Sequence, residues 1–358
     1  MHIEEELKSY KARLDPKIDA YFNDVIKDIT KEDALVGEAL EHARAIVMAG
    51  GKRLRSAFMY YGYQGAGGTE EEKILDASVS IELLHAFLLV HDDIIDRDDL
   101  RHGVPTLHVR YADFGRRYFP EKDVAHFGNS IALIMGDMLH AFGNDILFRS
   151  DFPKERIFQA LSCVQHIVSM TVIGQARDIY MEYKREASEE EILAMYKNKT
   201  AKYTVEGPLH LGAILAGASD EFLADLSAYA IPLGIAFQIQ DDILGIFGSA
   251  SRIGKPVGSD IEEGKITLLV SLALKHGSQT EQKQLKKILA LGTHISDTEI
   301  ETFRTIISRT GALSGAKERA ETYIKEGMVA LEKIKPLLTA QAYDFLSSVA
   351  VYMIKREF

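Results

Sequence analysis

The chain has 358 residues, of which 46% are hydrophobic, so it can bury a substantial core in one large domain or two ordinary ones. Its formal net charge of −11 argues against a nucleic-acid-binding protein and against attachment to anionic membranes through general basic charge. The single Cys163 cannot form an internal disulfide and the acidic N-terminus lacks a secretory pattern, so we expect a cytoplasmic protein.

The apolar runs in the sequence are short. The longest, at residues 81–90 and 228–236, are too short or too soon followed by charges to span a bilayer, so we expect no transmembrane segment and no stable membrane insertion.

Helical periodicity runs along the chain and strand alternation is almost absent, which predicts an all-α fold. Three capping boxes indicate helix starts, at Thr69 to Glu72, Ser188 to Glu191 and Ser296 to Glu299. Breaks are expected at residues 62–68, 103–105, 152–153, 216–220, 248–264 and 277–282, where Gly, Pro or polar residues gather. No linker separates these segments, so residues 1–358 are expected to form a single helical domain built around a central cavity.

The first segment with candidate chemistry is GGKRLR at residues 50–55. Three cations behind two glycines can form an anion site that needs no metal. Taken alone, such a segment is more often a basic helix start than a ligand site.

An apolar helix is then expected to end in HDDIID, residues 91–96. Asp92 and Asp96 are four residues apart and share one helix face, while Asp93 is rotated by about 100°. Carboxylates crowded at a helix C-terminus repel one another and oppose the helix dipole, which suggests bound cations. An isolated motif of this kind is more often a solvated acidic face.

A second apolar stretch ends in QDDILG, residues 240–245, and repeats the design with Asp241 and Asp242. Two facing helix ends with oxygen ligands favour Mg²⁺, which binds through a few carboxylates together with substrate phosphates. Arg101 follows the first cluster, and Lys255 and Lys265 follow the second, where they would stabilise charge on a leaving diphosphate.

Residues 50–267 resemble the trans-isoprenyl diphosphate synthases, also called polyprenyl synthetases. The resemblance is carried by GGKRLR, HAFLLVHDDIID with LRHGVPTLH, MGD at residues 135–137, GQARD at 174–178, KNKT at 197–200, FQIQDDILG and GKPVGSDIEEGKIT. It implies an all-helical homodimer that uses Mg²⁺, about three ions per site with the substrate diphosphate, to join isopentenyl diphosphate head-to-tail onto an allylic diphosphate.

The same resemblance implies a role for each motif residue. It makes Asp92, Asp93, Asp96, Asp241 and Asp242 the metal ligands, and Arg101, Lys199, Lys255 and Lys265 the contacts of the allylic diphosphate. It assigns Lys52, Arg55, His85 and His102 to isopentenyl diphosphate, and it places Thr200 and Gln238 beside the developing carbocation. Helix geometry supports two of these placements, because His85 lies seven residues before Asp92 and Gln238 three residues before Asp241.

Two positions depart from the family pattern. His102 stands where the family usually has a second arginine, so its charge depends on pH near 6.5 if its pKa is unperturbed. Gly245 stands where many members have a third aspartate, which leaves two carboxylates in the second cluster.

Product length in this family is limited by bulky side chains below the first aspartate cluster. Phe87, five residues before Asp92, is the candidate floor, with Leu88 and Leu84 as the neighbouring alternatives. This pattern resembles the short-chain synthases that make geranylgeranyl diphosphate, with farnesyl diphosphate as the alternative product. Phe87 is equally compatible with simple packing against a neighbouring helix.

Three other functions fit parts of the sequence. A terpene cyclase shares the first aspartate motif, but its second motif contains Asn, Ser and Glu, and it does not need GGKRLR. A noncatalytic partner subunit is expected to lose aspartates, whereas both clusters here keep their leading pairs. A plain metal-binding bundle leaves five cations, Lys52, Arg55, Lys199, Lys255 and Lys265, without a role.

Overall fold

The computed structural model describes residues 2–248 and 258–354, and this part of the chain is all-α apart from one short hairpin. The N-terminal elements are α1 (Ile3–Glu32), α2 (Ala34–Ala49), α3 (Leu54–Gly65) and α4 (Glu71–Asp96), followed by β1 (Leu100–Arg101) and β2 (Val104–Pro105). The central elements are α5 (Leu107–Tyr118), α6 (Val124–Phe148), α7 (Lys154–Lys184), α8 (Glu189–Tyr196), the π-helix η1 (Lys197–Glu206), α9 (Gly207–Ala216) and α10 (Asp220–Phe247). The C-terminal elements are α12 (Ser259–Glu262), α13 (Leu268–His276), α14 (Gln279–Ile288), the 3₁₀-helix η2 (Gly292–His294), α15 (Asp297–Arg309), α16 (Ala312–Ile334), the 3₁₀-helix η3 (Lys335–Leu337) and α17 (Ala340–Ile354).

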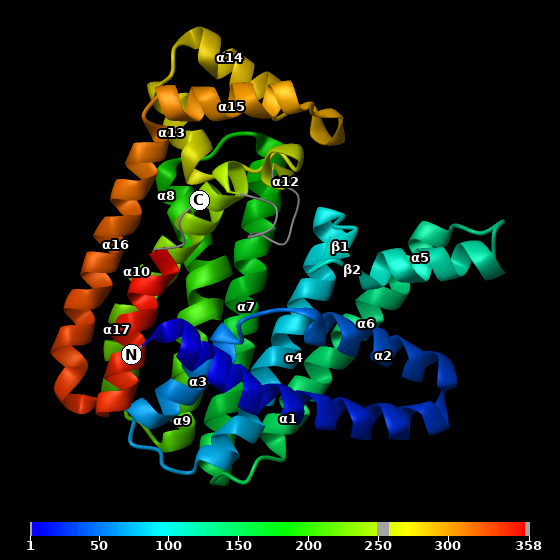
Figure 1. The fold of residues 1–358 in the computed structure, drawn as a ribbon, viewed down its shortest axis with the longest axis vertical. Coiled ribbons are helices and arrows are strands. Elements are labelled where there is room, and N and C mark those ends of the chain that lie inside the picture. The colour runs from blue at the N-terminus through cyan, green and yellow to red at the C-terminus, as the bar shows by residue number, and fades with distance from the viewer. Residues whose placement is uncertain (1, 249–257, 355–358) are drawn as a thin grey trace.

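Long helices surround the centre of the molecule. In Figure 1, α4, α7 and α10 run through the middle, α1 and α2 cross below them, and α16 and α17 flank α10. The helices α13 to α15 gather at one end, and α5 with the start of α6 projects to the side. The most extensive helix contacts join α4 to α6, α10 to α16, α5 to α6 and α3 to α9.

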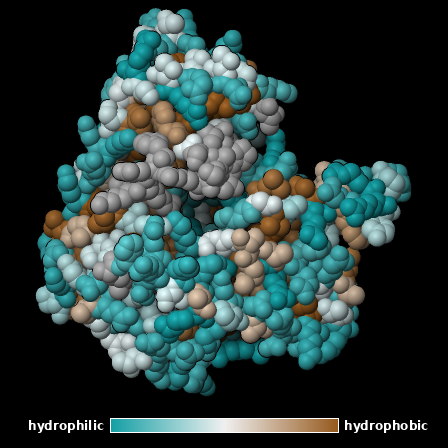
Figure 2. Space-filling model, in the orientation of Figure 1, coloured by the Kyte–Doolittle hydropathy of each residue, from teal (hydrophilic) through white to brown (hydrophobic). Residues whose placement is uncertain are grey.

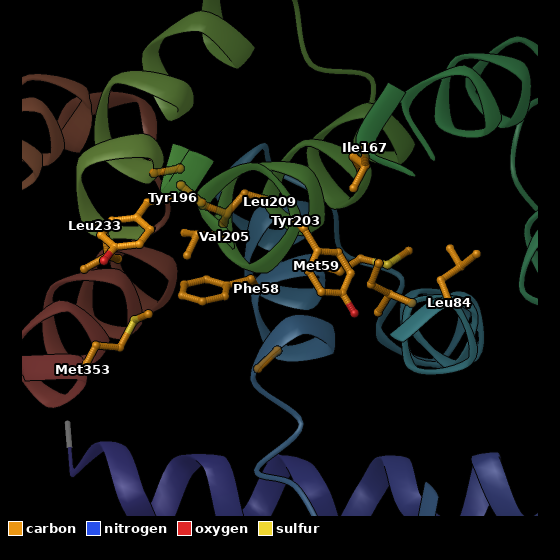
Figure 3. Close-up of a cluster of buried hydrophobic side chains, with 14 of the residues drawn as sticks. Phe58, Met59, Leu84, Ile167, Tyr196, Tyr203, Val205, Leu209, Leu233 and Met353 are labelled. Carbon is orange, nitrogen blue, oxygen red and sulfur yellow. The ribbon is translucent and has the colours of Figure 1, made fainter. Parts of the chain in front are cut away.

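The core forms where these helices converge. Figure 3 shows Phe58 of α3, Tyr203 of η1 and Leu233 of α10 meeting side chains from α4, α9 and α17 in one cluster. Burial of such aromatic and aliphatic side chains contributes about 1.5–3 kcal/mol each, so the helices around the centre are held in fixed positions.

Two of the three predicted capping boxes are confirmed. Ser188 with Glu191 opens α8, and Ser296 with Glu299 opens α15. The box at Thr69 was wrong, because α4 begins at Glu71 and the backbone N–H of Glu70 donates to the Tyr63 hydroxyl instead.

The hairpin after α4 was not predicted as strand. His102 and Gly103 form its turn with φ of 51° and 78°, the positive values that a type I′ turn requires. Since Arg101 pairs with Val104, this turn brings the Arg101 side chain back toward the end of α4.

The sequence predicted that no segment is long and apolar enough to span a membrane, and for four helices this was wrong. By length and composition alone, α4, α6, α7 and α10 each qualify. The apolar runs read from the sequence underestimated them, because each helix contains a window of 18 residues with no more than two charged residues. In α4 72% of the apolar window is buried inside the protein, but in α6 and α7 only 33% is. The face drawn in Figure 2 is mostly hydrophilic, with hydrophobic residues in separate areas.

Candidate active site

A cavity of about 1740 Å³ lies among the described residues, where α4, α10 and the start of α3 meet. Most of the polar residues selected from the sequence line it. These are Lys52, Arg55, His85, Asp92, Asp96, Arg101, His102, Lys199, Gln238, Asp241, Asp242 and Lys265. Lys255 lies outside the described residues.

The first aspartate cluster divides into two parts. Asp92 and Asp96 line the cavity, as their shared helix face predicted. Asp93 is only 1% exposed and is not part of the wall that the described residues form; it accepts a hydrogen bond from Arg101 Nε at 2.9 Å. Burial raises the pKa of the Asp93 carboxyl to about 6, although Arg101 opposes this rise. The geometry therefore separates Asp93 from the two other carboxylates of the motif.

Asp242 of the second cluster is almost fully buried. Its carboxylate accepts hydrogen bonds from the Tyr196 hydroxyl and, at 2.7 Å, from Gln238 Nε2. Burial raises the pKa of Asp242 to about 8, and the neighbouring Asp260 carboxylate adds to the rise. Asp241, the other member, also lines the cavity.

Asp260 of α12 is a cavity residue for which no role was predicted from the sequence. A side chain at Gly245 would begin 2.5 Å from Asp260 Oδ2, so this carboxylate occupies the space that a side chain at position 245 would need. The signal was present in GSDIEEGK, but periodicity does not reveal that α12 folds back onto α10.

Two lysines bridge the walls of the cavity. Lys199 Nζ lies 2.7 Å from Asp178, and Lys265 Nζ lies 3.2 Å from Asp96. Burial alone disfavours both ammonium groups, but the surrounding carboxylates outweigh it and raise the pKa of each lysine. Both side chains are therefore positively charged at neutral pH beside the two aspartate clusters.

Lys199 and Thr200 are positioned by the π-helix η1, a wide helical turn of a kind that is often found at functional sites. It approaches its neighbours closely, since a Cβ on Gly234 of α10 would lie 2.4 Å from the Ala201 Cα. Thr200 is buried, is not itself in the cavity wall of the described residues, and donates to Gln238 Oε1 at 2.5 Å.

The side chains of the cavity supply only some of the ligands that a divalent cation needs. Among the described residues, no group of three or more His, Cys, Asp or Glu side chains is arranged to hold a metal ion. Asp92, Asp96 and Asp241 nevertheless present carboxylate oxygens from two helices to one cavity. Such a donor set suits Mg²⁺, which keeps several waters and completes its shell with phosphate oxygens.

A second group of basic side chains lies at the α3 side of the cavity. Arg55 Nη1 lies 3.1 Å from His85 Nε2, and the guanidinium stacks 4.4 Å from the centre of the Tyr203 ring. Burial, then Arg55, lowers the pKa of His85 well below its usual value, so this histidine is neutral. It therefore accepts from Arg55 at Nε2 and donates from Nδ1 to the Tyr203 hydroxyl.

Lys52 and His102 complete this group. The Lys52 ammonium contacts the Tyr352 hydroxyl of α17 and lies 4.9 Å from the centre of its ring. Tyr352 was missed because it is 300 residues away in sequence. The His102 ring packs against Gly50, where a Cβ would lie 2.5 Å from the ring.

The proposed chain-length residues do not line the cavity of the described residues. Phe87 packs between helices, with its ring centre 4.9 Å from that of His91 and 5.0 Å from that of His140 on α6. Leu84 faces Gly143 of α6, and Leu88 packs against the core. The α4 side chains that do line the cavity near Asp92 are Ala86 and Leu89.

The chain is similar to several known proteins over its whole length. The polyprenyl synthetase family model matches residues 37–307. A geranylgeranyl diphosphate synthase of Methanosarcina mazei is 31% identical over 358 residues, which cover 100% of this chain and 99% of the relative. A geranylfarnesyl diphosphate synthase of Aeropyrum pernix is 33% identical over 343 residues, 95% of this chain and 99% of the relative. The crystal structure of a geranylgeranyl pyrophosphate synthase from Corynebacterium glutamicum, complexed with isoprenyl diphosphate and magnesium, has a TM-score of 0.89, is 32% identical, and covers 100% of both chains.

Proposed function

Because this chain belongs to the polyprenyl synthetase family and is a trans-prenyltransferase, we propose that it condenses isopentenyl diphosphate with an allylic diphosphate, head-to-tail and with Mg²⁺. The observation that carries the proposal is one cavity with a carboxylate site, which would take a diphosphate through Mg²⁺, and a separate basic site, which would take one directly. Carboxylates of α4 and α10 lie at one part of it, and Lys52, Arg55 and His102 lie at another. A terpene cyclase binds a single diphosphate and has no need of the second site.

The carboxylates would hold the metal. Asp92, Asp96 and Asp241 are the proposed direct ligands, and Asp242 supports them from its buried position beside Gln238. When bound, Mg²⁺ would act as a Lewis acid on the allylic diphosphate and neutralise charge on the leaving group. Asp93 then serves to hold Arg101, rather than to bind metal as its motif implied.

The basic side chains would act on the two diphosphates separately. Lys199, Lys265 and Arg101 stabilise the negative charge that develops as the allylic C–O bond breaks. Lys52, Arg55 and His102 hold isopentenyl diphosphate, whose double bond supplies the electron pair of the new C–C bond. A proton leaves to the departing diphosphate, and the product is five carbons longer. Gln238 presents its amide to the cavity beside the cation, and Thr200 holds that amide in place from behind through their hydrogen bond.

We propose geranylgeranyl diphosphate as the main product, with farnesyl diphosphate as the alternative. The similar proteins carry the names of geranylgeranyl and geranylfarnesyl diphosphate synthases, so the size of the product is the open variable. The test is chromatography of the products formed from dimethylallyl, geranyl and farnesyl diphosphates with isopentenyl diphosphate, with Mg²⁺ and with chelator. Cyclic hydrocarbons, or no elongation from any starter, would contradict the proposal.

We also propose a cytoplasmic homodimer. The apolar side chains that α6 and α7 leave exposed support it: Leu133, Ile134, Phe148, Phe158, Val172, Ile173, Tyr180 and Tyr183. Exposed apolar surface of this extent on adjacent helices is typical of a protein interface. Light scattering of the purified protein should give twice the chain mass of 39.9 kDa. An Ile134→Asp variant should shift the protein toward monomer, and a wild-type monomer at micromolar concentration would refute this part.

A further inference from the structure

The start of α3 holds a backbone conformation that Arg53 does not favour. Arg53 has φ of 53° and ψ of 38°, in the left-handed region, and the preceding Gly51 also has a positive φ of 90°. For a residue with a Cβ, this conformation costs roughly 1–3 kcal/mol and persists only where the surrounding contacts impose it. The contacts of Arg53 therefore need to account for the conformation.

Three helices hold the Arg53 guanidinium, which is only 5% exposed. Nε donates to Asp15 of α1 at 2.8 Å, Nη1 to Glu82 of α4 at 3.1 Å, and Nη2 to the Val47 carbonyl of α2 at 2.8 Å. Each donor position thus serves a different helix, which the planar fork of arginine allows and a lysine ammonium does not reproduce.

The charges around Arg53 are balanced within the protein. Asp15 also pairs with Lys11 at 2.7 Å, and Glu82 is 3% exposed, so two cations meet two carboxylates. This balance leaves the Arg53 charge committed to the protein, even though the residue borders the cavity.

Two cationic side chains close to Arg53 in the sequence, Lys52 and Arg55, line the same cavity. Lys52 extends toward Tyr352 of α17, and Arg55 extends toward His85 and Tyr203. Their starting points are set by the backbone that Arg53 fixes. We propose that Arg53 is a positioning residue: it fastens the loop before α3 to α1, α2 and α4, and thereby aims Lys52 and Arg55 at the metal-free diphosphate site. The inference rests on the proposed function, in which these two cations bind isopentenyl diphosphate.

Steady-state kinetics of Arg53→Lys test the proposal, because the charge is kept and the three-way fork is lost. KM for isopentenyl diphosphate should rise about tenfold or more, since misplacement of a binding group by about 1 Å can cost a hundredfold. KM for the allylic diphosphate and kcat should stay within about twofold of the wild-type values, because the α4 and α10 carboxylates are not displaced. The thermal unfolding midpoint is measured for each variant.

Asp15→Asn is the milder second variant. The Asp15 side chain is 21% exposed and Arg53 keeps Glu82, so this variant should fold and show a smaller rise in the same KM. Arg44→Lys is the matched control, because Arg44 also joins α2 to α1, through Asp19, but lies away from the cavity. It should change neither KM.

Two sets of results separate the inference from the function on which it rests. A wild-type chain without condensing activity, or an Arg55→Ala variant with a normal KM for isopentenyl diphosphate, would contradict the proposed function and remove the basis of the inference. The role of Arg53 alone would be overturned if Arg55→Ala raised KM for isopentenyl diphosphate while Asp15→Asn left it normal. A folded Arg53→Lys variant with a normal KM for isopentenyl diphosphate would overturn it in the same way. An equal rise of both substrate KM values in Arg53→Lys would overturn it as well.

Discussion

Asn substitutions at the adjacent residues Asp92 and Asp93 should have opposite effects. Asp92 lines the cavity, whereas Asp93 is buried in an ion pair with Arg101. Breaking a buried pair costs about 3–5 kcal/mol. Arg101 keeps a second partner, Asp98, at 3.1 Å, so the low end of about 3 kcal/mol applies to Asp93→Asn.

That cost converts into a measurable shift in unfolding temperature. An unfolding entropy of about 2.1 cal/mol/K per residue amounts to about 0.75 kcal/mol/K for this chain length. Asp93→Asn should therefore lower the unfolding midpoint by about 4 °C. Asp92→Asn should leave the midpoint nearly unchanged and lower kcat by about a hundredfold or more.

Thermal unfolding and the Mg²⁺ dependence of turnover, measured on the same preparations, separate the two roles. Asp92→Asn should need more Mg²⁺ for half-maximal turnover, and Asp93→Asn should keep the wild-type requirement while raising KM for the allylic substrate as Arg101 moves. If Asp93→Asn were as stable as wild type and shared the weakened Mg²⁺ dependence of Asp92→Asn, the assignment of Asp93 to Arg101 would be wrong.

Two further substitutions test the diphosphate site and the π-helix. Burial and then Arg101 lower the pKa of His102, so the wild-type ring is neutral above about pH 6.5 and gains charge only as the pH falls below that value. His102→Arg should therefore lower KM for isopentenyl diphosphate throughout the range from about pH 6.5 to 8, and an unchanged KM there would remove His102 from the site. Gly234→Ala should push η1 away from α10, lower kcat and destabilise the protein by about 1–3 kcal/mol, whereas Gly315→Ala, with ordinary contacts at 3.4 Å, should do neither. Normal turnover in Gly234→Ala would show that Lys199 and Thr200 tolerate movement.

Local spacing predicted the parts of the site that lie on one helix. The spacings of four positions from Asp92 to Asp96 and of seven positions from His85 to Asp92 were enough to place all three on the cavity side of α4. The same geometry rotates Asp93 off that side, but its partner Arg101 depends on a type I′ turn that no periodicity signals. The sequence thus placed Asp92 and Asp96 on the cavity side but did not predict that Asp93 pairs with Arg101.

Contacts between segments that are distant in the sequence could not be predicted from local patterns. Asp260 reaches the space above Gly245 because α12 packs on α10, and Tyr352 reaches Lys52 from the last helix. The π-helix η1 was also missed, since a 3.6-residue pattern does not distinguish it from the flanking α8 and α9. These features arise from tertiary packing, which overrides local preference at the positions that carry chemistry.

The structure changes the prediction of which residue limits product length. Phe87 lies five residues before Asp92, which on an ideal helix is about 140° around the axis, and its ring packs against His91 and His140 between α4 and α6. A chain growing along the cavity wall meets Ala86 and Leu89 first. Phe87 can therefore limit the length of the product only from behind Ala86 and Leu89.

Phe87→Ala should therefore both destabilise the protein and lengthen the products. A residue that only lined the cavity would change product length without a large loss of stability. Removal of a buried ring costs about 3–5 kcal/mol and leaves a cavity between α4 and α6. If the growing chain uses that space, products should lengthen to twenty-five carbons or more while kcat for the first condensation is kept. Leu89→Ala is the comparison, because it widens the wall without opening the α4–α6 contact. Chromatography of products from both variants decides between them: longer products from Leu89→Ala alone would make Leu89 the limit and leave Phe87 as a packing residue.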